Sequence, residues 1–255
     1  MIQEFGNRVF FGLRSKFSIP LRPRPYAESG GDRLVQFAFS PLIASHLSPQ
    51  NLRLNLYYYE LLDSVAWTIP NKEGRIIDLG SKNFGYCFAL AESLRRKNWE
   101  GELKGLELDP YRRFVSYYRR IDHAQFFVGL ANREFSPEIT LDYQEGDWLN
   151  YSLDKKFDLV FCFFPFLFLD LHHQWGLSRK SFSPKQFYQK IFAQSDQAIL
   201  VHQGREEFDC SRQLLADLKI DSSEFCELHQ SQWINLRIPS FVIYAKRKPK
   251  DLSPV

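Results

Sequence analysis

Two apolar segments that each end in an acid constrain the fold of this chain most. The first contains Asp78 and turns at Gly80 and Gly85, and the second, residues 103–109, contains Glu107. A helical pattern lies between them, so the pair forms a βαβ unit whose parallel strands bring both carboxylates to one edge of a sheet. Such an edge suits a ligand with hydroxyls and an amine. The sequence therefore predicts a site for a nucleoside-type cofactor.

Strand and helix patterns alternate along the rest of the chain. The pattern predicts strands at 75–79, 102–107, 139–143, 157–164, 197–202, 225–229 and 241–247, and helices at about 49–67, 85–97, 110–133, 184–195 and 205–218. This alternation predicts an α/β fold: a Rossmann-like, mostly parallel seven-stranded sheet with helices on both faces. Residues 230–240 contain Pro239 and no helical periodicity, and they are too few for a parallel crossover. The last strand should therefore run antiparallel.

The N-terminal fifth of the chain has a composition of its own. Residues 1–50 are basic and interrupted by prolines, and we interpret them as an N-terminal extension or cap. Residues 51–255 then form the α/β domain. The chain has 255 residues, of which 44% are hydrophobic and 24 are phenylalanine, so it can bury a proper core.

Charge and cysteine usage narrow the class of protein. A net charge of +3 and a pI of about 8.6 give nucleic-acid binding only weak support. The four cysteines stand singly without metal-ligand spacing, which favours reduced thiols in a cytoplasmic protein and no metal site. The apolar run 159–171 contains Pro165 and is too short to span a bilayer, so we expect a buried strand there and no membrane association.

The turn after Asp78 distinguishes between two cofactor classes. Gly80 and Gly85 occupy the outer positions of a dinucleotide-binding G-x-G-x-x-G motif, but Lys82 stands where the middle glycine lets the backbone approach a pyrophosphate. An acid at the strand end would also repel a pyrophosphate, whereas it suits the amino group of a methionine moiety. A nicotinamide-dependent oxidoreductase is thus the weaker alternative.

At these residues the chain resembles the class I S-adenosylmethionine-dependent methyltransferases, over roughly residues 70–248. The matching features are Asp78-Leu79-Gly80 at the opening of the family's acid-x-Gly-x-Gly-x-Gly turn, Glu107 at the second strand end, Gly146-Asp147-Trp148 after the third strand, the apolar fourth strand 157–164, and the antiparallel last strand. Lys82 and Phe84 replace the second and third glycines of the turn, and Gly85 comes one residue late.

The resemblance implies S-adenosyl-L-methionine as the cofactor. By this resemblance, Asp78 and Gly80 lie at its methionine end, Glu107 binds the ribose hydroxyls, and Asp147 with Trp148 contacts the adenine. Gly85 is a further cofactor-binding residue. We add the hypothesis that Lys82 pairs with the cofactor carboxylate, a charge-assisted contact worth roughly 1.5–3 kcal/mol.

Simpler roles stay open for each of these residues. Asp78 and Asp109 could cap the helices that follow them, Asp147 could be a turn residue, and Trp148 could belong to the core. Glu107 could be only a solvated acid at a strand end. The conjunction of three acids at three successive strand ends is what favours a cofactor site.

The segment after the fourth strand offers the candidates for acceptor chemistry. His172 and His173 should lie in a loop at the C-terminal rim of the sheet, where either could deprotonate a hydroxyl or amine, or could simply pack or be solvated. Phe163-Phe164-Pro165-Phe166 lacks the polar residue with which methyltransferases of nucleobase amines hold their target. A hydrophobic lip beside the methyl-transfer site is more natural.

The sequence thus favours an enzyme that transfers a methyl group from S-adenosylmethionine to a small-molecule acceptor. The alternatives are a non-catalytic S-adenosylmethionine-binding or relic scaffold protein, supported by the altered turn, and an RNA methyltransferase. The sequence indicates neither the acceptor atom nor an oligomeric state.

Overall fold

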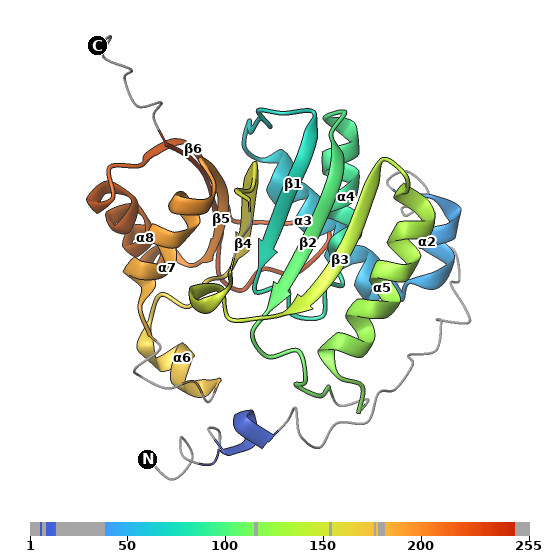
Figure 1. Cartoon of the computed structure of the whole chain (residues 1–255), viewed down its shortest axis with the longest axis horizontal. Coiled ribbons are helices and arrows are strands. Elements are labelled where there is room, and N and C mark those ends of the chain that lie inside the picture. The colour runs from blue at the N-terminus through green and yellow to red at the C-terminus, as the bar shows by residue number, and fades with distance from the viewer. Residues whose placement is uncertain are drawn as a thin grey trace.

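The fold is a seven-stranded sheet with helices packed against it (Figure 1). The computed structural model describes residues 6, 9–13, 39–114, 117–152, 155–175, 177 and 182–247. The strands are β1 (Glu73–Leu79), β2 (Glu100–Glu107), β3 (Ile139–Glu145), β4 (Leu159–Phe163), β5 (Gln197–Gln203), β6 (Asp221–Leu228) and β7 (Ser240–Lys246). Their order is β3-β2-β1-β4-β5-β7-β6, and β7 runs antiparallel to both β5 and β6. The predicted fold class and antiparallel last strand are confirmed.

Side-chain alternation along the central strands divides the core into two parts. The first part contains Ile76 of β1 and the buried faces of α2 (Pro41–His46), α3 (Pro49–Asp63), α4 (Cys87–Arg96) and α5 (Arg120–Phe135). The second contains Ile77 and the buried faces of α7 (Pro184–Gln194) and α8 (Arg205–Asp217). Because neighbouring residues of a strand point to opposite faces, β1 contributes to both parts.

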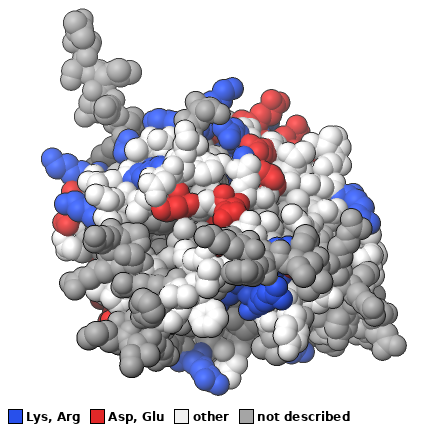
Figure 2. All heavy atoms as spheres, turned by 60° about the horizontal axis from the view of Figure 1, so that its bottom comes forward, with Lys and Arg blue, Asp and Glu red and all other residues white. Residues whose placement is uncertain are grey.

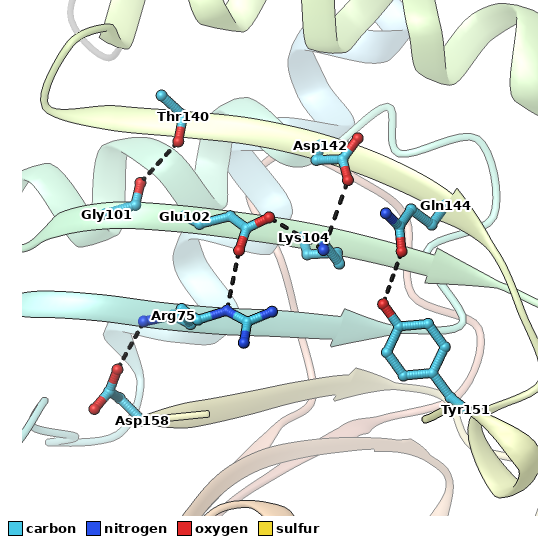
Figure 3. Close-up of polar contacts among 9 residues, drawn as sticks. All are labelled: Arg75, Gly101, Glu102, Lys104, Thr140, Asp142, Gln144, Tyr151 and Asp158. Atoms are coloured by element: carbon cyan, nitrogen blue, oxygen red, sulfur yellow. Dashed lines mark hydrogen bonds and ion pairs between the residues drawn. The ribbon is translucent and has the colours of Figure 1, made fainter. Parts of the chain in front are cut away.

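On the sheet face that holds the second core part, β1 to β3 carry charged side chains where a helix could have packed (Figure 3). Arg75 Nε lies 3.1 Å from Glu102 Oε2, and Lys104 Nζ lies 3.1 Å from Glu102 Oε1 and 3.7 Å from Asp142 Oδ2. Among the described residues, the chain between β3 and β4 forms only a short 3₁₀ helix, Trp148–Asn150. No helix of the described residues therefore packs on this face of β1 to β3, and paired charged side chains occupy it.

Two local predictions were wrong. The helix predicted at 110–133 begins only at Arg120, because Asp122 Oδ2 accepts the Arg119 N–H at 2.8 Å and caps the chain at that point. Asp109 is therefore not a helix cap. His172 and His173 lie in a short helix, α6 (Leu169–Gln174), and not in a loop.

Most of the predicted N-terminal extension lies outside the described residues. Within it, α2 contacts α5, and the helical residues 9–13, blue in Figure 1, lie with α6 beyond the C-terminal ends of the strands. In the part of the chain that the structure describes, no helix is both long and apolar enough to cross a membrane. The same residues contain no group of three or more side chains suited to hold a metal ion.

Candidate functional site

A cavity of about 320 Å³ opens at the C-terminal ends of the parallel strands. Its wall is built from residues that follow β1, β2, β3 and β4, from α6, from the first turns of α7 and α8, and from Phe11. Open α/β sheets bind ligands at this edge, and the volume lies at the lower end of the usual range of about 300–1,000 Å³. The cavity is therefore the candidate functional site.

The loop after β1 has the backbone of a glycine-rich turn, although two of its three left-handed positions are not glycine. Gly80, Lys82 and Phe84 all have a positive φ, of 74°, 52° and 51°. A non-glycine residue in this region costs roughly 1–2 kcal/mol. Two contacts hold Lys82 there: its N–H donates to Glu107 Oε2 at 2.7 Å, and its carbonyl accepts from the Tyr143 hydroxyl at 2.6 Å.

The two residues that replace glycines face opposite ways. Phe84 is fully buried in the first core part, where its ring lies 6.2 Å from that of Tyr86 and 6.1 Å from that of Tyr143. It does not line the cavity, so it does not fill the space a ligand would take. Lys82 does line the cavity.

Lys82 presents a cation to the cavity. Its Nζ lies 5.4 Å from the centre of the Phe164 ring, and among the described residues no carboxylate pairs with it. Burial, with the nearby Arg120 charge as a second cause, lowers the pKa of Lys82 below its ordinary value. An anionic group in the cavity would offset that desolvation cost.

Glu107 lines the cavity but already has three donors. It accepts from the Lys82 N–H at 2.7 Å, the Asp109 N–H at 2.8 Å and Arg120 Nη1 at 2.9 Å. The Glu107 and Arg120 side chains are only 4% and 7% exposed. Arg120 in turn lies 4.3 Å from the centre of the Trp175 ring, on which Arg112 also packs at 4.5 Å. The ion pair fixes the carboxylate at the end of β2, where lone-pair capacity is left for a ligand hydroxyl.

Asp78 lies under the loop and not on the cavity wall. The residue is fully buried, its Oδ2 accepts from the Tyr86 hydroxyl at 2.8 Å, and its Oδ1 has no partner among the described residues. Burial, opposed by hydrogen bonds from Tyr86 and Ser81, raises the pKa of Asp78 to about 8. Asp78 is therefore mostly protonated at neutral pH and offers little charge to an amine.

The segment after β3 forms an apolar wall beside an acid. Asp147 and Trp148 both line the cavity, with Leu108 of the preceding strand end, whose side chain is a large exposed hydrophobic group. The Asp147 carboxylate accepts from the Leu149 N–H at 3.0 Å and from Asn150 Nδ2 at 2.6 Å, so it also caps the 3₁₀ helix. Trp148 is only 4% exposed and belongs to the second core part, so Leu108, at 37%, offers most of the accessible apolar surface here.

The two histidines and Gly85 differ in their relation to the cavity. His172 lines it and is 6% exposed, with its ring 5.3 Å from Phe182 and 6.3 Å from Phe166. His173 and Gly85 are not among the lining residues. The Gly85 carbonyl accepts from Asn55 Nδ2 at 2.7 Å, which ties the loop to α3.

Sequence reasoning missed several residues of the site. Arg120 pairs with Glu107, and Phe182, Phe187 and Glu207 line the cavity from the start of α7 and α8. A buried arginine at the first position of a helix has no distinctive pattern in a single sequence. The acid pair at the start of α8, Glu206-Glu207, is the one signal present, and it resembles ordinary stabilisation of a helix N-terminus.

Comparison with known proteins supports the fold. No family model matches the chain, and no curated protein matches it. Among solved structures, a putative class I S-adenosylmethionine-dependent methyltransferase from Listeria monocytogenes matches at a TM-score of 0.52 and 13% identity, over 86% of this chain and 66% of that one. The chain therefore has the fold of the class I methyltransferases.

Two further solved structures are similar at lower scores. A glycopeptide N-methyltransferase in complex with S-adenosylmethionine matches at a TM-score of 0.49 and 12% identity, over 74% of this chain and 86% of that one. A putative RNA methyltransferase from Pyrococcus horikoshii matches at 0.46 and 14%, over 94% and 97% of the two chains.

Proposed function

We propose that this protein transfers a methyl group from S-adenosylmethionine to a small-molecule acceptor. The observation that carries the proposal is the composition of the cavity, whose lining combines a half-buried ammonium, a fixed carboxylate and an apolar wall. These groups complement, in that order, the carboxylate, ribose and adenine of the cofactor. The fold agrees with this use of the cavity.

In this proposal, each residue has a defined task. Lys82 binds the cofactor carboxylate, Gly80 allows close approach of the loop, and Glu107 accepts from the ribose hydroxyls. Leu108 and Trp148 cover the faces of the adenine, and Asp147 lies beside its amino group. Asp78 and Gly85 act indirectly, because they fix the loop from below through Tyr86 and Asn55.

The bound cofactor supplies an electrophilic methyl group on a sulfonium. The protein then has to bind the acceptor, exclude water and align the nucleophile. Positioning of this kind contributes roughly 7–11 kcal/mol to a barrier. A reaction of this type needs no fixed catalytic motif.

The distribution of charge is the reason to prefer a small acceptor to RNA. Figure 2 shows the face at the C-terminal ends of the strands, where the Lys and Arg side chains of the described residues form separate groups, and Asp and Glu side chains also lie on this face. Nucleic-acid binding typically uses a continuous basic surface. The mainly aromatic lining near α6 and α7 also favours a small organic molecule.

The altered loop is the specific observation in favour of a non-catalytic binding protein. Lys82 and Phe84 cost strain that glycines would avoid, and a chain under no catalytic demand could accumulate such changes. Turnover separates the two functions: a methyltransferase forms S-adenosylhomocysteine when an acceptor is present, whereas a binding protein holds the cofactor unchanged.

Calorimetry with S-adenosylhomocysteine tests the proposal. We expect binding with a Kd of about 1 μM, and about tenfold weaker binding in Lys82→Met because a charge-assisted contact is lost. Lys97→Met is the matched control, since Lys97 also packs on an aromatic ring, Trp67 at 4.2 Å, but lies outside the cavity. Equal affinity in all three proteins would remove Lys82 from the site. Binding of NADH in place of S-adenosylhomocysteine would overturn the proposal.

A further inference from the structure

One part of the cavity wall, which we call the acceptor half, is an unbroken row of aromatic rings. Trp175 lies 5.1 Å from Phe166, Phe166 lies 6.3 Å from His172, and His172 lies 5.3 Å from Phe182. These four residues, called the aromatic row below, all line the cavity. Such a row suits the faces and edges of a ring system.

Phe164 adds a strained contact to this half. It has a φ of 59°, its N–H donates to the Val201 carbonyl at 2.8 Å, and its ring receives the Lys82 ammonium. A phenylalanine in the left-handed region is uncommon, and such strain concentrates at ligand sites. The ring is thus held between the two halves of the cavity.

Glu207 is the carboxylate of this half. It stands in the first turn of α8, and its Oε2 accepts from the Gln203 N–H at 2.8 Å, while Oε1 makes no hydrogen bond within the described residues. The other lining acids are Glu107, Asp109 and Asp147, which follow or end β2 and β3, and of these Glu107 and Asp147 use both carboxylate oxygens within the chain. Glu207 therefore keeps an acceptor atom for a ligand.

Few polar groups accompany Glu207. His172, Ser183 and Gln203 are the remaining polar lining residues of this half. His172 is nearly covered by Phe166 and Phe182, so its ring contributes edges to the row. An acceptor with many hydroxyls or amides would lose its hydration here without regaining partners.

We propose that the methyl acceptor is a mostly apolar, ring-containing small molecule with a single hydroxyl or amino group, which Glu207 binds through its hydrogen. This inference rests on the proposed function. During transfer, the O–H or N–H bond of the acceptor breaks and its proton passes to Glu207. The freed electron pair forms the bond to the methyl carbon, and the electrons of the broken S–C bond stay on the sulfur of S-adenosylhomocysteine. Glu207 later releases the proton to water.

A binding cycle tests the role of Glu207 without requiring turnover. The probes are β-naphthol and its methyl ether, which has the same rings but no hydrogen to donate, each titrated into protein saturated with S-adenosylhomocysteine. We expect Glu207→Gln to weaken β-naphthol binding about tenfold and to leave the ether unchanged, because only the hydroxyl contact loses its charge. Glu206→Gln, an exposed change on the same helical turn, should leave both unchanged.

The pH dependence of β-naphthol affinity provides a second test, because a purely structural role of Glu207 would not change it. Burial raises the pKa of Glu207, while the pKa values of its neighbours Tyr188 and Cys210 are also raised and stay above neutral. Binding of β-naphthol to the wild type should weaken as the pH falls through the raised pKa of Glu207. The ether, and β-naphthol with Glu207→Gln, should show no such change.

The possible outcomes distinguish failure of this inference from failure of the proposed methyltransferase function. If Glu207→Gln weakens binding of both probes equally, Glu207 does not bind the acceptor hydrogen. The same holds if His172→Phe, and not Glu207→Gln, abolishes the difference in affinity between β-naphthol and its ether. If guanosine or a single-stranded oligoribonucleotide binds the loaded protein and neither naphthalene does, the acceptor class is wrong while cofactor binding stands. Failure of S-adenosylhomocysteine to bind would overturn both proposals.

Discussion

The two halves of the cavity are built on different principles. The part that we propose binds the cofactor, the cofactor half, contains Gly80, Lys82, Glu107, Asp147 and Trp148, and the proposed acceptor half contains the aromatic row, Phe187 and Glu207. In the first half, charged groups are held by short hydrogen bonds to the backbone and to Arg120. In the second, rings pack on rings and one carboxylate oxygen is left over. Rigid charge suits a ligand of fixed shape, and an aromatic enclosure selects by size and apolarity.

The largest expected difference between the halves concerns stability. Phe84 is fully buried under the cofactor half, whereas Phe166 of the acceptor half is only partly buried. Phe84→Ala should lower the free energy of unfolding by about 3–5 kcal/mol even though it relieves backbone strain, because a large cavity results. Phe166→Ala should cost about 1 kcal/mol. Urea unfolding measures both, and equal losses would contradict the contrast.

A buried ion pair sharpens the comparison further. Arg120→Met leaves the Glu107 charge without its partner and should destabilise the fold by about 3 kcal/mol. The control is Arg205→Met on α8, whose pair with Asp209 is 61% and 55% exposed and should change stability by less than about 1 kcal/mol. If Arg120→Met proves as mild as the control, Glu107 is not held as described and the cofactor half is not preorganised.

Titration of Asp78 gives an effect that is small over any one pH unit and has a defined sign. Its pKa rises from 3.8 in the unfolded chain to about 8 in the fold, so the folded state binds the extra proton between those values and the wild type loses stability as the pH rises through that window. Relative to the wild type, Asp78→Asn should therefore gain stability by at most about 1.4 kcal/mol per pH unit from about pH 4 to pH 8, and no further above it.

Chemical denaturation of the two proteins across this pH range isolates Asp78, because other buried groups titrate in both. His202 is one of them: burial lowers its pKa to about 3, so its contribution to stability falls as the pH drops below its unfolded value. A constant difference between Asp78→Asn and the wild type at all pH values would show that Asp78 is ionised in the fold.

The sequence predicted the cofactor half better than the acceptor half for a topological reason. Acids at the ends of parallel strands must meet at one edge, so Glu107 and Asp147 could be placed together from local patterns. The same patterns placed Asp78 wrongly beside them, although the alternation of side chains along β1 contains the signal. Asp78 shares the face of Ile76, which packs in the first core part. Leu79 shares the face of Ile77 and lines the cavity.

The acceptor half comes from α6, α7, β5 and α8, consecutive elements whose lining residues share no sequence pattern. Phe182, Phe187 and Glu207 look like ordinary residues at helix beginnings, and only tertiary packing brings them together. The glycine-like φ of Lys82 and Phe84 was equally hidden, because neither residue favours it locally and the contacts of Glu107, Tyr143 and the core impose it.

A crystal structure of the protein soaked with S-adenosylhomocysteine tests the central claim most directly. The account predicts the adenine against Leu108 and Trp148, the ribose hydroxyls on Glu107 and the amino-acid carboxylate on Lys82, with the sulfur directed toward the aromatic row. Density for the ligand elsewhere, or a cavity that stays empty at saturating ligand, would contradict it.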